Sequence, residues 1–193
     1  GRPTGLFAAD ASPDELIAKG VAFLKPRQEA NGGWSTQRGP GITGIVITAL
    51  LRSKRVTPAD PSIEKGLTYL EGFISPKGGV AEGPQANYNT SITLMAFHEA
   101  NAKGRYTARI KAAQEFLKQL QWDEGEKKGK VDPYYGGAGY GGKSRPDLSN
   151  TAFFLDALRD SGLPADDPAL KKALVFVSRC QNLKSEFNDQ PFA

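Results

Sequence analysis

Apolar and polar residues follow a helical period along most of the chain. In the segments that follow Pro61 and Pro168, apolar residues recur three and four positions apart, with Lys and Glu opposite. This spacing predicts amphipathic outer helices that each bury one face. Three further segments are apolar on most sides, which is typical of inner helices surrounded by others. These inner segments are residues 42–53, 89–100 and 150–160.

Helix starts are marked by capping residues followed by proline. Ser12, Asp60 and Asp167 each precede a proline, and their side-chain oxygens can accept a hydrogen bond from a free amide of the first turn. Ser12 and Glu15 together form a capping-box pattern. Thr107 is predicted to cap a fourth segment, which lacks the proline. The sequence therefore predicts four outer helices.

Two series of residues recur with the same spacing, which indicates an internal repeat. An aromatic residue stands in each outer segment and a threonine opens each inner one, at intervals of about 47 residues, with about 13 additional residues in the third copy. The series are Phe23, Tyr69, Phe116 and Phe176, and Thr43, Thr90 and Thr151. The unit is therefore a helical hairpin, and we expect one all-α domain over residues 1–193. Its repeats span 12–53, 60–101, 107–162 and, incompletely, 167–193.

Composition and charge exclude several classes of protein. Of 193 residues, 39% are hydrophobic and 24% charged, and no apolar run approaches the roughly 20 residues of a transmembrane segment. The net charge of +4 comes from scattered basic residues, so we expect no nucleic-acid partner. The chain has 22 glycines, and nearly all of this excess lies in the loops that join outer to inner helices, where glycine permits tight reversals.

One stretch of the first repeat resembles a known family. Lys19-Gly-Val-Ala-Phe23-Leu, then Gln28, then Gly-Gly-Trp34, is similar to the Gln-Trp motif of squalene and hopene cyclases, in the terpenoid cyclase and protein prenyltransferase superfamily. Gln121 and Gln181 follow their aromatic residues at the same distance, whereas the second copy has no Gln and has Val80 in place of Trp. The resemblance implies an α/α toroid of nested helices. On physical grounds alone, the Gln amide can bond free carbonyls and the Trp can stack on the next hairpin, which ties the repeats together.

The predicted ring is incomplete. Seven helices make three and a half hairpins, whereas the resemblance implies about five to seven hairpins in a full toroid. We therefore expect a fragment of a longer chain, whose exposed edge packs on missing repeats or on a second copy. The compartment is not predicted, because removal of a signal peptide would leave the same sequence.

The resemblance implies a catalytic acid at the start of one inner helix. Hopene-type cyclases carry Asp-x-Asp-Asp-Thr there, and this chain has Asp147-Leu-Ser149-Asn150-Thr151. Ser149 stands where the proton donor belongs, and a hydroxyl is far too weak an acid to protonate an alkene. Asp147 is the remaining catalytic candidate. The alternative interpretation is that Asp147 caps the third inner helix.

Prenyltransferase-type zinc binding is not supported by the residues. The chain has one Cys and one His, Cys180 and His98, which is too small a ligand set. Cys180 lies four residues after Phe176 and is predicted to be a buried thiol. His98, near the end of an inner helix, is predicted to interact with the last carbonyls. We therefore predict no metal and no cofactor.

The candidate ligand-binding residues lie in the long third loop and at the starts of inner helices. Glycine-rich backbone that leads into a helix with two cations can hold a phosphate, and tyrosine faces can stabilise a cation or stack on a sugar. The alternative is a loop that closes one face of the ring, with its tyrosines packed on glycine backbone. The candidates are Tyr134, Tyr135, Tyr140, Lys143 and Arg145 in the loop, and Thr43, Asn89 and Asn150 at the helix starts.

Two hypotheses of function follow. The first is a cyclase-like or prenyltransferase-like protein that handles an isoprenoid or another apolar small molecule. The second is a non-catalytic toroid that acts as a binding or scaffold module. An interior filled by Phe153, Phe154 and Met95 would leave no room for a polyprenyl chain and would favour the second.

Overall fold

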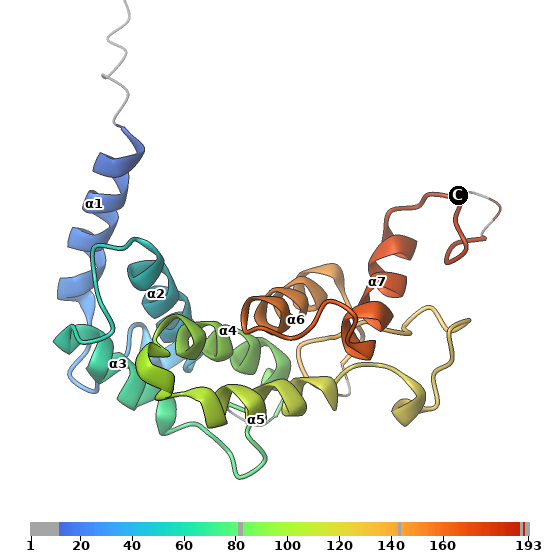
Figure 1. The fold of residues 1–193 in the computed structure, drawn as a ribbon, viewed down its shortest axis with the longest axis horizontal. Helices are drawn as coiled ribbons and strands as arrows, with labels where there is room; N and C mark the ends of the chain where they lie inside the picture. Colours follow the sequence, from blue (N-terminus) through green and yellow to red (C-terminus); the bar gives the residue numbers. More distant parts are fainter. Residues whose placement is uncertain (1–11, 81–82, 143, 190, 192–193) are drawn as a thin grey trace, which may run out of the picture.

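The computed structural model describes residues 12–80, 83–142, 144–189 and 191. This part of the chain folds into seven α-helices joined by loops and short 3-10 turns, without a β-strand (Figure 1). The predicted all-helical class is confirmed. The helices are α1 (Pro13–Leu24), α2 (Gly41–Arg52), α3 (Pro61–Glu71), α4 (Ala86–Glu99), α5 (Thr107–Lys118), α6 (Leu148–Asp160) and α7 (Pro168–Cys180).

Three of the four outer helices begin with the predicted cap. Ser12 and Glu15 form the full capping box at α1, and the carboxylates of Asp60 and Asp167 accept from the backbone at α3 and α7. The prediction for Thr107 is wrong, because it is the first residue of α5 and makes no cap hydrogen bond. In the preceding turn, Asn101 Oδ1 accepts a hydrogen bond from the amide of Tyr106 at 2.7 Å. Tyr106, one residue before Thr107, therefore takes the N-cap position of α5.

The helices form an inner and an outer row. In the inner row α4 packs between α2 and α6, and α3, α5 and α7 pack on α2, α4 and α6 respectively. Figure 1 shows the rows as an open arc, with α1 at one end and α7 at the other. Each hairpin thus contributes one helix to each row, as the two sequence series predict.

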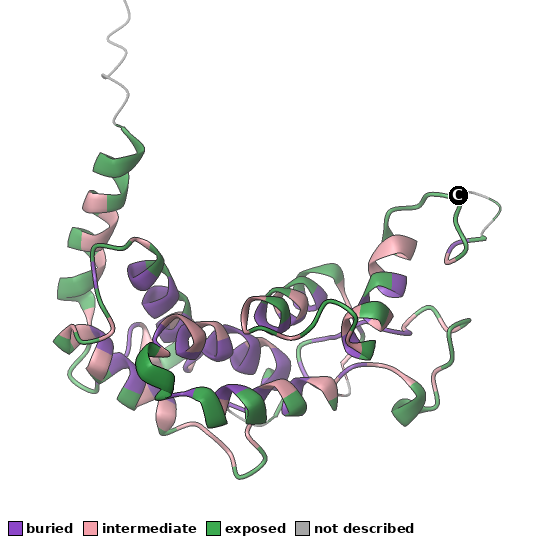
Figure 2. Cartoon of the chain, viewed as in Figure 1, coloured by how far each residue is buried: buried purple, intermediate pink, exposed green. Residues whose placement is uncertain are grey.

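Burial is concentrated in the inner row (Figure 2). Ten of the 14 residues of α4 are buried, among them polar ones such as Asn87 and Ser91. α1, by contrast, has no buried residue, and Leu16 and Phe23 on it are 58% and 55% exposed. The core therefore lies between the rows, and burial decreases toward α1.

One arginine links the carboxyl-terminal ends of the inner helices. Arg52 Nε lies 2.6 Å from Glu99 Oε1, and Arg52 Nη2 lies 2.8 Å from Asp160 Oδ2. Burial raises the pKa of Asp160, but hydrogen bonds from Arg52 and Arg159 outweigh burial and lower the pKa overall. A cation at these helix ends also offsets the partial negative charge of the last carbonyls.

Candidate functional site

Each loop packs against the next outer helix, and we call these contacts junctions. The first junction is loop 28–40 against α3, the second is loop 74–80 against α5, and the third is loop 121–142 against α7. In each, the first glycine of a Gly-Gly pair has a positive φ of 83–91°, and a Cβ there would come closer than 3.0 Å to a carbonyl of the next helix. Only glycine fits such a position. The pairs of glycine and helix residue are Gly32 with Lys65, Gly78 with Ala112, and Gly136 with Lys172.

The second glycine of each pair receives the aromatic ring of the next outer helix. A Cβ on this glycine would meet the ring at 3.0 Å or less. This contact explains the aromatic series in the sequence. The pairs are Gly33 with Tyr69, Gly79 with Phe116, and Gly137 with Phe176. No loop of the described residues covers Phe23. The centroid of its ring instead lies 3.4 Å from the guanidinium carbon of Arg27.

The threonine that opens each inner helix fastens the loop before it. Thr43 Oγ1 accepts from the amide of Trp34 at 2.9 Å, and Thr90 and Thr151 accept in the same way from the residues after the other glycine pairs. All three threonines are fully buried. Thr43, predicted as a ligand contact, therefore uses its hydroxyl within the fold.

The glutamines tie successive repeats together, as predicted. Gln28 Nε2 donates to the carbonyls of Gly32 and Ser62, both at 2.7 Å. Gln121 Nε2 makes the equivalent pair of bonds, both at 2.9 Å, to its own loop and to the second residue of α7. Because one carbonyl lies in the loop and the other in the next outer helix, each amide bridges two hairpins.

Trp34 fills the first junction. It is 3% exposed, its ring lies against Gly66 of α3, and its Nε1 donates to the carbonyl of Leu24 at 2.8 Å. The predicted stacking of the Trp on the next hairpin is confirmed. A buried indole whose N–H is satisfied contributes a large apolar area without a polar penalty.

Asp147 caps α6. Its Oδ1 accepts from the amide of Asn150 and its Oδ2 from the Asn150 side chain, both at 2.8 Å. Both carboxylate oxygens therefore bind the helix start, and the carboxylate lies where an anion would otherwise bind. Asn150 is buried by this contact, and Asn89 is buried with its Oδ1 facing Gly41 of α2.

The tyrosines of the long loop lie in three different environments. Tyr135 is buried and its hydroxyl donates to Glu124 at 2.9 Å. Tyr134 meets the ring of Trp122 edge-on, and Tyr140 is 51% exposed beside Tyr88. The structure thus does not bring these three rings together.

The backbone of the long loop closes onto α4. The Tyr140 carbonyl accepts from the amides of Asn87 and Tyr88, which are free donors at the start of that helix. Arg145 is exposed. Lys143 lies outside the described residues.

Hydrogen bonds also shift the ionisation of Glu124. The Lys172 ammonium, the local backbone and the Tyr135 hydroxyl together lower the pKa of Glu124 to about 2. Desolvation lowers the pKa of Lys172, but its two carboxylate partners, Asp123 and Glu124, outweigh that and raise it. These ionised groups fasten the long loop to α7.

The chain's single Cys and single His lie far apart in the sequence and in different helices. Cys180 is exposed, so the prediction of a buried thiol is wrong: it is the last residue of α7, four positions beyond Phe176, the last buried residue of that helix. His98 lies in the last turn of α4. Within the described ranges there is no cluster of three or more potential metal-ligating side chains, and no helix there is long and apolar enough to cross a membrane.

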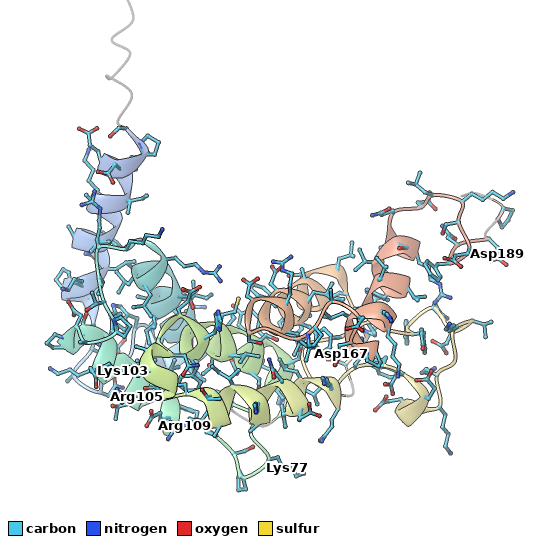
Figure 3. The ribbon with its side chains drawn as sticks, viewed as in Figure 1. Lys77, Lys103, Arg105, Arg109, Asp167 and Asp189 are labelled. Atoms are coloured by element: carbon cyan, nitrogen blue, oxygen red, sulfur yellow. The ribbon has the colours of Figure 1, made fainter. Side chains whose placement is uncertain are left out.

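The second junction contains a cavity of about 230 Å³. Its walls are largely apolar, but three side-chain atoms at its border are buried without a hydrogen-bond partner: Thr93 Oγ1, Ser75 Oγ and a terminal nitrogen of Arg109. Arg109 lies on α5, where Figure 3 labels it. Its terminal nitrogen still lies 2.7 Å from Glu71 Oε1, so the guanidinium is neutralised. The lining residues are Ile74, Ser75, Pro76, Gly78, Val80, Thr93, Leu94, Phe97, Ala108, Arg109, Ala112 and Ala113.

Thr93 and Arg109 were not among the predicted site residues. The sequence signal that points to them is the departure of the second repeat, with Ile74 and Val80 at the positions of Gln28 and Trp34. Comparison of the chain with protein-family models and with curated proteins finds no match to either.

Proposed function

We propose that the chain is an arc of an α/α toroid that acts as a non-catalytic binding module for an apolar small molecule. The observation that carries this proposal is the state of Asp147, the one acid at the place where the resemblance implies catalysis. Both of its oxygens accept hydrogen bonds from Asn150 at 2.8 Å. Because both oxygens are engaged in capping the first turn of α6, neither is left to deliver a proton to a bound alkene.

The packing of the inner row supports the same proposal. Phe154 is fully buried in the core and Met95 packs against it from α4. Phe153 is partly buried and its ring centroid lies 5.3 Å from that of Tyr88. These packing contacts leave fewer apolar side chains to line a tunnel for a polyprenyl chain.

The exposed face of α1 supports the toroid arrangement. On α3, α5 and α7, three repeat positions contact the loop of the preceding repeat. The same positions on α1 are Lys19, Gly20 and Phe23. Among the described residues, no atom comes within 4 Å of a Cβ built on Gly20, and Phe23 is exposed. A further hairpin of the same repeat, with its own glycine pair, fits this face.

Incubation of the protein with squalene and with geranylgeranyl diphosphate tests the absence of catalysis. We expect no product above that of heat-denatured protein when extracts are analysed by gas chromatography and mass spectrometry. The matched variant is Asp147→Asn, because Asn caps helices as well as Asp does and the fold is kept. A product made by the original chain and lost in Asp147→Asn would overturn the proposal and favour an isoprenoid cyclase.

A further inference from the structure

The cavity of the second junction corresponds to side chains that fill the first junction. In the first junction, Gln28 and Trp34 occupy the space between the loop, the inner helix and the next outer helix. The repeat places Ile74 and Val80 at these two positions in the second junction. Neither replacement supplies an amide or an indole.

The walls of the two sites match position by position. In the first junction, the Gln28 amide touches Gly32 and Ser62, and the Trp34 ring lies against Gly66, which also faces Ile47. The equivalent positions about 47 residues later all line the cavity. They are Gly78, Arg109, Ala113 and Leu94.

We propose that this cavity binds a neutral, planar heteroaromatic small molecule of indole size that carries a ring N–H. The shape argument is the repeat itself, because the same walls surround an indole in the first junction. The polar argument rests on the Gly78 carbonyl, which receives no hydrogen bond from any described side chain. The equivalent carbonyls of Gly32 and Gly136 each accept one from a glutamine amide, that of Gln28 and that of Gln121. A ring N–H would supply that donor.

A buried hydroxyl provides a second polar contact. Thr93 is fully buried, and its Oγ1 lies at the cavity without a hydrogen-bond partner. The equivalent position in α2 is Val46, so the hydroxyl is not required by the repeat. Leaving it unpaired is costly, and a ligand that pairs it recovers that cost.

The charge of the site favours a neutral ligand. Arg109 is the one cationic side chain in the lining, and Glu71 lies 2.7 Å from it. An anion would have to compete with this carboxylate. The proposal is independent of whether the chain is catalytic, since the cavity is separated along the chain from Asp147.

Titration of the full chain with indole, followed by amide NMR shifts, tests the proposal. We expect saturable shifts centred on loop 74–80 and the first two turns of α5. Val80→Trp fills the cavity from within the chain, and we expect it to abolish binding while the helical circular dichroism is kept. Absence of saturable shifts in the original chain, or unchanged binding in folded Val80→Trp, would overturn the proposal.

Thr93→Val tests the polar contact at nearly constant shape. The probe for this contact is benzimidazole, because indole has a single N–H and no acceptor, whereas benzimidazole has a ring N–H for the Gly78 carbonyl and a second ring nitrogen that can accept from the Thr93 hydroxyl. We expect benzimidazole to bind Thr93→Val about tenfold more weakly than the original chain, since one hydrogen bond is lost. The matched control is Thr48→Val, because Thr48 is also buried but bonds its own helix at Gly44, and we expect no change in binding there. Equal affinities of Thr93→Val and the original chain would refute the role of the hydroxyl.

N-acetyltryptophanamide separates a free small molecule from a tryptophan side chain of a peptide. We expect it to bind more weakly than indole, because its backbone groups do not fit between the loop and α5. Tighter binding of N-acetyltryptophanamide would overturn the small-molecule proposal in favour of a peptide ligand.

Discussion

The first and second junctions occupy the same place in successive repeats but are filled differently. Both have the glycine pair against the next outer helix and the threonine that holds the loop amide. Trp34 and Gln28 then fill the first, whereas Ile74 and Val80 leave a cavity in the second. The backbone contacts therefore set the geometry of the repeat, and the side chains that fill the junction vary without changing it.

Removal of the indole from the first junction is expected to have the largest effect. Trp34→Val should lower the free energy of unfolding by about 3 kcal/mol, because it deletes a buried ring and leaves a cavity like that of the second junction. Denaturant unfolding measures the change. Added indole should restore part of the lost stability by binding the new cavity. A loss below about 1 kcal/mol would show that Trp34 does not support the junction.

Removal of the bridging amides is expected to have a smaller effect. Gln121→Leu should lower the free energy of unfolding by about 2 kcal/mol, because it unpairs the Gly136 carbonyl and breaks the bridge to α7. Gln28→Leu should behave similarly but with a smaller loss, since Gln28 is less buried.

The matched control for both variants is Gln181→Leu. Gln181 holds the same repeat position but is exposed, so its change should stay within about 0.5 kcal/mol. Equal losses at Gln181 and Gln121 would contradict the bridging role.

The sequence was sufficient to predict the repeat because repeat contacts leave a periodic signal. The threonine and aromatic series correspond to a hydrogen bond and a ring contact that recur at every junction. The site was predicted less well. Tyr134, Tyr135 and Tyr140 are close in sequence, but the loop directs them to Trp122, Glu124 and Tyr88.

Two local predictions failed because neighbouring contacts decided them. The side chain of Asn101, which precedes α5, accepts a hydrogen bond from the amide of Tyr106, so Thr107 does not act as the cap. Cys180 lies at the exposed end of α7, beyond its last buried residue. The cavity was not predicted from the sequence. It arises because Ile74 and Val80 leave empty the space that Gln28 and Trp34 fill in the first junction.

The smallest expected difference between the first and second junctions is in how stability depends on pH. Lys25 Nζ lies 2.8 Å from Asp60 Oδ2, and this contact together with Ser62 lowers the pKa of Asp60 from 3.8 to about 2. In the second junction the corresponding positions are Glu71 and Thr107, so this pair is missing.

Below pH 4, unfolded Asp60 binds protons that the folded form excludes. The stabilisation is therefore complete above about pH 4 and is lost as the pH falls through 2. Asp60→Asn keeps a capping side chain but removes the charge, so unfolding measured between pH 2 and 5 should depend less steeply on pH. At neutral pH the variant should lose less than about 1 kcal/mol, because the pair is partly exposed. Glu124 in the third junction, whose pKa is also about 2, should preserve the remaining slope. Identical slopes in Asp60→Asn and the original chain would show that the Lys25–Asp60 pair does not couple the first two hairpins.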